Sequence, residues 1–147
     1  MSVKIVGGSG GAIDVAAREY VKTSTAATGV GDLLSDTGAG LTRSTSTDTV
    51  AGATTFHSVA QSIQTASQLV VQAVRLVPGM LLEMDTTANT ASNQVNRRRP
   101  VTDHLTLDNS STDSNANTAP FRIVALVGAA ADRKCLVEFL GIGQLNS

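Results

Sequence analysis

The chain has no tryptophan, one tyrosine and three phenylalanines, so aromatic residues make up only 3% of its 147 positions. Aromatic side chains bury more area than most others, and their scarcity leaves burial to smaller aliphatic side chains. The chain is long enough to form one domain, and its 41% apolar residues can supply a real core. We expect modest stability per residue unless neighbouring molecules add contacts.

An excess of charge of either sign is also missing. Eleven Lys and Arg residues stand against twelve Asp and Glu residues, for a net charge of -1. General nucleic-acid binding needs a basic surface that can neutralise phosphates, and electrostatic docking to an anionic membrane needs the same. The charge balance therefore argues against both nucleic acid and membrane as partners.

The chain has one cysteine, Cys135, which cannot form an internal disulfide. This fits a reducing compartment, or a fold that needs no covalent link. No stretch approaches the apolar length of a membrane helix, and the first residues lack the apolar segment of a signal peptide. We expect a soluble protein that is made and used without secretion.

Residues 1–55 are rich in glycine, serine, threonine and alanine, and hold nine of the 13 glycines. Such a segment buries too little apolar surface alone to offset its ordering entropy. We predict an extended arm that lies against something else. The stretch 12–22 fits a short helix or a strand equally well. Tyr20, Leu33 and Leu34 are the arm residues expected to contact a partner or another subunit.

Residues 56–147 have the pattern of a compact β-rich module. In 69–77, Val70, Val74 and Leu76 share one face, and Pro78-Gly79 is a turn signal. After the turn, Met80, Leu82 and Met84 alternate with more polar positions, which is typical of a half-buried strand. A helix across 61–77 is the alternative, since apolar residues there also fit a helical stripe.

Three later segments extend this pattern. The stretch 101–107 alternates and predicts a short strand, and 108–118 is a long polar loop. The runs 121–127 and 134–142 predict an antiparallel pair joined by 128–133. Phe121, Ile123 and Val127 are expected to face a core, as are Cys135, Val137 and Phe139. The predicted fold is mostly β, a small antiparallel barrel or sandwich with at most one short helix, which carries the N-terminal arm.

The glycines at 7–11 resemble a nucleotide-binding loop, but the pattern stops there. A dinucleotide fingerprint has a third glycine where this chain has Ile13, and no second apolar strand follows Val21. No Gly-Lys-Ser or Gly-Lys-Thr run occurs, which excludes a P-loop. We therefore predict that the chain binds no nucleotide and no other cofactor.

The residues that could carry catalysis or bind a metal are few and far apart. His57, His104 and Cys135 do not have the spacing of a zinc site, and Cys135 has the apolar neighbours of a core residue. No nucleophile elbow of the Gly-x-Ser-x-Gly type is present. We predict neither a catalytic residue nor a metal ligand, so the chain is not expected to be an enzyme.

Arg97, Arg98 and Arg99 form a basic run before Pro100. Three guanidinium groups can grip a phosphate or the carboxylates of a partner, although a solvated loop is the simpler interpretation. No aromatic residue lies near to stack on bases. If the run binds anything, we expect an acidic protein surface rather than nucleic acid.

Two stretches carry a resemblance to a known family. "RLVPGMLLEMDTT" (75–87) resembles the Pro-Gly-Met-Leu-Leu-Glu turn and strand of small phage head-decoration, or cement, proteins. "APFRIVALVGAAADRKCLVEFLGIGQ" (119–144) resembles their closing strand pair. The resemblance covers roughly the C-terminal half.

The resemblance implies a structural virion protein, made in the host cytoplasm, that sits on the outside of a phage capsid. It would clamp adjacent major-capsid subunits and stabilise the head. Its partners would be the major capsid protein and other copies of itself, with a trimer favoured because decoration sites often lie on three-fold axes. Another virion component, such as a tail or head-fibre module, is the first alternative, and a small hydrolase the second.

Overall fold

The computed structural model describes residues 2–10, 15–23, 25 and 27–141. Strands make up 44% of the structure and short helical turns 4%, so the predicted mostly-β fold is confirmed. The strands are β1 (Lys4–Gly8), β2 (Arg18–Val21), β3 (Leu33–Asp36), β4 (Leu41–Arg43), β5 (Thr55–Ala60), β6 (Val70–Arg75), β7 (Met80–Thr86), β8 (Arg98–Arg99), β9 (Thr106–Leu107), β10 (Phe121–Val127) and β11 (Lys134–Phe139). Two single 3-10 turns lie at Ser92–Gln94 and Ala130–Asp132.

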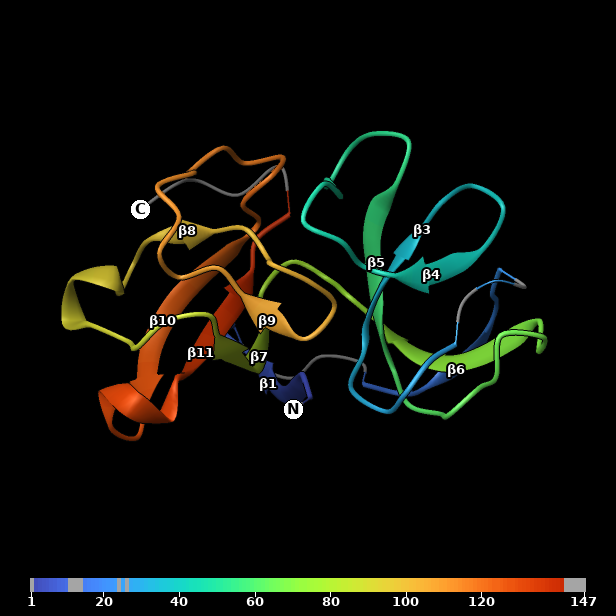
Figure 1. The fold of residues 1–147 in the computed structure, drawn as a ribbon, viewed down its shortest axis with the longest axis horizontal. Helices are drawn as coiled ribbons and strands as arrows, with labels where there is room; N and C mark the ends of the chain where they lie inside the picture. The colour runs from blue at the N-terminus through green and yellow to red at the C-terminus, as the bar shows by residue number, and fades with distance from the viewer. Residues whose placement is uncertain (1, 11–14, 24, 26, 142–147) are drawn as a thin grey trace.

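The strands form two sheets that occupy opposite halves of the molecule (Figure 1). The first sheet has the order β1-β7-β11-β10-β8, and β9 runs parallel to the end of β7. The second sheet has the order β2-β6-β5-β3-β4, and all its pairs are antiparallel. Strands distant in sequence are therefore neighbours in both sheets.

The second sheet curls until its two edge strands meet. Lys22, just after β2, forms a bridge to Leu41 of β4, and the Thr23 N–H donates to the Leu41 carbonyl over 2.9 Å. Gly40, at a φ of +149°, permits this approach, because an added Cβ would lie 3.0 Å from the Lys22 backbone. This half of the molecule is thus a small five-stranded barrel, called the barrel lobe below.

Small side chains fill the barrel lobe. The cluster inside it comprises Leu34, Leu41, Ala60, Val71 and Ala73, and Tyr20 packs against them. Lys22 is also buried, and its ammonium donates to the carbonyls of Thr23, Ala66 and Gln68. These bonds satisfy the buried charge and fasten the β5–β6 connector to the end of β2.

The main core lies between the two sheets and uses all three phenylalanines of the chain. Phe56 on β5 meets Phe121 on β10 edge to face, with ring centroids 5.7 Å apart, and Phe121 meets Phe139 on β11 at 5.5 Å. Aliphatic residues of both sheets surround them, including Leu33, Val59, Val74, Leu82 and Val137. The few large anchors of the sequence are therefore concentrated where the sheets pack together.

The expected arm at 1–55 is wrong as a description of the structure. Its described residues supply β1 to the first sheet and β2, β3 and β4 to the second. Val3 is 3% exposed and Leu33 is fully buried in the main core. These strands are short, and β1, β2 and β3 pair with strands later in the chain, so the local apolar content did not reveal their burial.

The two segments that the sequence allowed to be either helix or strand, 12–22 and 61–77, each contain a strand. Strand β2 covers the end of 12–22, while 11–14 lie outside the described residues. Strand β6 covers 70–75, so the helical alternative for 61–77 is wrong. The single strand expected at 101–107 is also wrong: the chain turns tightly there, with the Thr102 N–H donating to the Thr106 carbonyl and the Asp103 carboxylate accepting from the Leu105 N–H.

The C-terminal predictions fare better. Met80, Leu82 and Met84 are at most 1% exposed, and Gly79 has a φ of +90° in a Pro-Gly turn closed by a bond from the Met80 N–H to the Val77 carbonyl. Strands β10 and β11 pair as predicted. One position is wrong: a bulge between Ile123 and Ala125 places Leu126, rather than Val127, on the core side.

Candidate partner-binding surface

One face of the second sheet continues beyond the first sheet that covers it. Side chains alternate along β6 without a register shift, so Val70, Gln72 and Val74 share a face. Val74 belongs to the main core and is 3% exposed, whereas Val70 is 41% exposed. The face that packs between the sheets therefore emerges into solvent at the N-terminal end of β6.

Neighbouring residues enlarge this exposed area. Val21 pairs with Val70 across the β2–β6 ladder and is 63% exposed. Leu69, whose carbonyl accepts from the Lys22 N–H, is 59% exposed. Ile63, in the same connector as Leu69, is 78% exposed. We call Val21, Leu69 and Val70 the apolar patch; a contiguous exposed apolar area is a candidate surface for a partner molecule.

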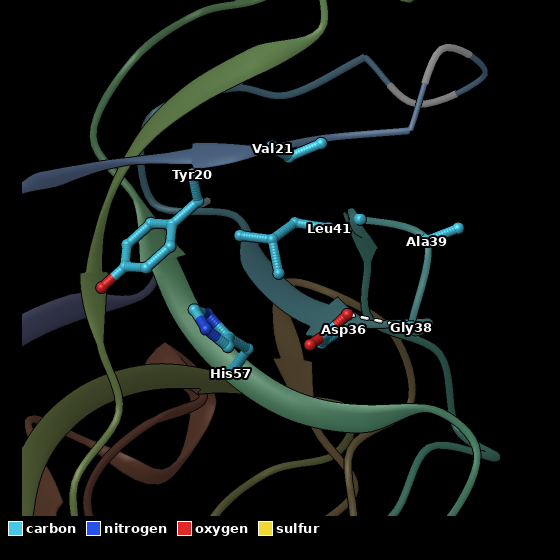
Figure 2. A pocket seen from close by; sticks show the side chains of 8 residues that line it. Tyr20, Val21, Asp36, Gly38, Ala39, Leu41 and His57 are labelled. Atoms are coloured by element: carbon cyan, nitrogen blue, oxygen red, sulfur yellow. Dashed lines mark hydrogen bonds between the residues drawn. The ribbon is translucent and has the colours of Figure 1, made fainter.

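A pocket adjoins the apolar patch where the barrel lobe opens (Figure 2). Its volume is about 370 Å³. The lining combines residues of β2, β3, β4 and β5 with the β3–β4 turn: Tyr20, Val21, Asp36, Gly38, Ala39, Gly40, Leu41 and His57. Val21 belongs to both the pocket and the patch, so the two form one continuous surface.

His57 lies on the β5 side of the pocket and is 9% exposed. Its ring meets the Tyr20 ring edge to face, with centroids 4.8 Å apart. Burial lowers the pKa of His57, Arg75 lowers it further, and Asp36 partly opposes both. The imidazole is thus neutral at pH 7, and its buried Nδ1 has no hydrogen-bond partner among the described residues.

Asp36 supplies the negative charge of the pocket. One carboxylate oxygen accepts from the Gly38 N–H over 2.8 Å and shapes the β3–β4 turn. Figure 2 shows the carboxylate on the same side of the pocket as His57, with Tyr20 and Leu41 close by. Because His57 is neutral, Asp36 is the charged group among the lining residues.

Of the arm residues proposed as contacts from the sequence, only Tyr20 reaches a surface that a partner could touch. Tyr20 is half-buried and lines the pocket. Leu33 and Leu34 are 0% exposed and lie inside the fold, so they offer no surface to a partner. The sequence singled out Tyr20 for the wrong reason, because it belongs to the barrel rather than to a free arm.

The three arginines of the basic run 97–99 also differ in their exposure. Arg97 is exposed, but Arg98 is 1% exposed and donates to the Ala119 carbonyl. Arg99 donates to the carbonyls of Asn109 and Arg98. Burial lowers the pKa of Arg98 and of Arg99. The guanidinium groups of Arg98 and Arg99 therefore hold backbone together, and Arg97 alone of the three faces solvent.

The candidate catalytic residues lie in structural roles. His104 has its Nε2 3.9 Å from Asp32, which also accepts from Arg43 over 2.9 Å, and the His104 carbonyl accepts from the Leu33 N–H. Cys135 is fully buried in the main core. Within the described part of the chain, no three His, Cys, Asp or Glu side chains gather as a metal site would need. Nor does any helix there have the length and apolar character to cross a membrane.

Comparison of the chain with protein-family models, curated proteins and solved structures finds no match in any of the three.

Sequence reasoning missed the apolar patch and the pocket. Val21 and Val70 look like ordinary core positions of strands, because alternation shows which face a residue occupies and not where the covering layer ends. Asp36 and His57 are 21 positions apart, and the curl of the sheet brings them to one pocket. No local sequence signal marks that curl.

Proposed function

We propose that this chain is a structural virion protein that binds the outside of a phage capsid and stabilises the head. The observation that carries the proposal is the apolar patch beside the barrel mouth, which supplies a surface for a protein partner. Val21 and Val70 are 63% and 41% exposed there, although they extend an otherwise buried face, and the adjacent Leu69 is 59% exposed. The two stretches that resemble decoration proteins, 75–87 and 119–144, add the identity of the partner, the major capsid protein.

The mechanism that fits this surface is mechanical. A rigid two-sheet body presses its apolar patch against the shell and spans adjacent capsid subunits. Each contact is modest, but many copies on one shell sum to a large stabilisation. Because the described residues of 1–55 belong to the folded body, bridging falls to its surfaces and to other copies of the chain. We further propose a small homo-oligomer, with a trimer on a three-fold axis favoured.

The test is co-sedimentation of the purified protein with phage heads that lack it. Wild-type protein should sediment with the heads, and the double variant Val21→Glu, Val70→Glu should remain in the supernatant, because two carboxylates would be desolvated in the contact. Val6→Glu is the matched control: Val6 is 57% exposed but lies on β1 in the other sheet.

Two results would contradict the proposal. If wild-type protein fails to sediment with intact heads, the capsid is not its partner. Equal sedimentation of wild type and the Val21→Glu, Val70→Glu variant would remove the apolar patch as the contact. Folding of every variant is checked by circular dichroism before sedimentation.

A further inference from the structure

The pocket at the barrel mouth is lined by apolar, aromatic and acidic residues together. It joins apolar walls, from Leu41 and Val21, to an aromatic ring, Tyr20, and a single carboxylate, Asp36. The neutral imidazole of His57, a residue that is 9% exposed, completes the lining, and its Nδ1 has no hydrogen-bond partner among the described residues. The unpaired nitrogen is shielded from solvent, so the Asp36 carboxylate is the charged group that a ligand entering the pocket can reach.

We propose that this pocket binds a basic side chain, arginine or lysine, from a partner protein. Such a side chain has an aliphatic stem, which Leu41 and Val21 can contact, and a cationic head, which Asp36 can pair. The face of the Tyr20 ring attracts a cation as well. An acidic side chain would meet the like charge of the Asp36 carboxylate, and a purely apolar one would not pair that charge.

Charge around the pocket supports this assignment. Among the lining residues, Asp36 is negative and none is Lys or Arg. Arg75 lies close enough to lower the pKa of His57, but it is not part of the lining and its side chain is exposed. Water screens such an exposed charge strongly, so it opposes an incoming cation less than Asp36 attracts it.

The neutral state of His57 suits the same ligand. A protonated imidazole would repel a cation, and burial keeps this imidazole unprotonated. The neutral ring therefore adds no positive charge to the lining. The pocket combines one formal negative charge with uncharged neighbours.

This inference deepens the proposed function, on which it rests for the identity of the partner: the basic side chain would belong to a capsid subunit that also covers the apolar patch. The chemistry of the pocket can nevertheless be tested without heads. Probe binding in the free protein reports on the pocket, and co-sedimentation reports on the capsid. Failure of either leaves the other result standing.

The experiment is an amide NMR titration of the full chain with n-butylguanidinium chloride, with n-butanol and sodium butyrate as comparison probes at constant ionic strength. We expect saturable shifts of the amides of Tyr20, Gly38, Ala39 and His57 with n-butylguanidinium. Its affinity should exceed that of either comparison probe by about tenfold or more, which corresponds to about 1.4 kcal/mol.

A pair of variants isolates the carboxylate. Asp36→Asn keeps an oxygen that accepts from the Gly38 N–H and removes the charge, so affinity for n-butylguanidinium should fall about tenfold. Asp113→Asn is the matched control, since Asp113 also accepts from a turn N–H, that of Asn115, but lies outside the pocket. It should bind n-butylguanidinium as the wild type does.

Three outcomes would overturn the inference: no saturable shift at these amides, equal binding of n-butanol or butyrate, or undiminished binding by Asp36→Asn. Equal binding of n-butanol would make the pocket a purely apolar depression. If Asp36→Asn fails to fold, the comparison of the three probes on the wild type decides by itself.

Discussion

Burial sets the protonation of the ionisable side chains that matter most in this molecule. It lowers the pKa of Lys22 and of His57, and it raises the pKa of the Cys135 thiol to about 12. In each case the charged form has lost water. Lys22 regains partners from three backbone carbonyls, whereas the Nδ1 of His57 has none among the described residues.

The thiol of Cys135 should be unreactive in the folded protein. Its side chain is fully buried, and burial, assisted by Asp85 and Glu83, keeps it protonated at neutral pH. We expect no reaction with a chromogenic disulfide reagent under native conditions and stoichiometric reaction after unfolding in guanidinium. Rapid reaction of the native protein would show that the strand pair β10–β11 opens or that Cys135 is exposed.

His57 should make the fold less stable in mild acid. Because its pKa in the folded state lies below its ordinary value, the unfolded chain takes up the proton first as pH falls from about 7 to 5, and the free energy of unfolding decreases. This loss ends once pH falls below the folded-state pKa. Urea unfolding at both ends of this range measures it.

The comparison variant is His57→Phe, which keeps an aromatic edge against Tyr20 and cannot titrate. It should lose less stability on acidification than the wild type does. At neutral pH it should be within about 1 kcal/mol of the wild type or more stable, because it removes an unpaired buried nitrogen. An equal pH dependence in both proteins would show that His57 does not titrate differently on folding.

At the scale of the strands, the sequence was a good guide where a strand carries its own pattern. Strand β7 alternates Met80, Leu82 and Met84 with more polar residues, and strands β10 and β11 are long and adjacent in sequence. The four strands before Thr55 are three to five residues long, and apart from the β3–β4 hairpin they pair with strands that lie later in the chain. Strands this short leave little periodic signal.

Only part of the candidate surface could be predicted from the sequence. The shared face of Val70 and Val74 follows from alternation alone, and the structure confirms it. Which of the two is covered depends on where the first sheet ends, and that is a property of the packing between sheets. The pocket depends on closure of the barrel through Lys22 and Leu41, and only the folded chain shows it.

The Pro78-Gly79 turn should be sensitive to a single methyl group. Gly79 has a φ of +90°, which strains any residue with a Cβ, so Gly79→Ala should cost about 1 kcal/mol of unfolding free energy. Gly10→Ala is the control, because its φ is not in the left-handed region and an added Cβ would meet nothing within 4 Å. Equal unfolding free energies of the two variants in urea would argue against the turn geometry.

At the scale of the whole molecule, the two sheets share one core and should unfold together. Leu33, Phe56 and Val59 of the second sheet pack in the same cluster as Phe121 and Val137 of the first. Hydrogen exchange of the isolated protein should therefore show protection of the β3 and β5 amides comparable to that of β7, β10 and β11. Rapid exchange throughout β1 to β4 would restore the view of residues 1–55 as a separate arm.

The central claim is that this folded body stabilises a phage head from outside, and the survival of heads on heating tests it most directly. Heads that lack the protein are heated alone, with the wild type, or with the Val21→Glu, Val70→Glu variant, and the DNA they release is measured. The account predicts that the wild type raises the temperature of DNA release and that the variant leaves it unchanged, while Val6→Glu protects like the wild type. A release temperature that is the same with and without the wild-type protein would contradict the account.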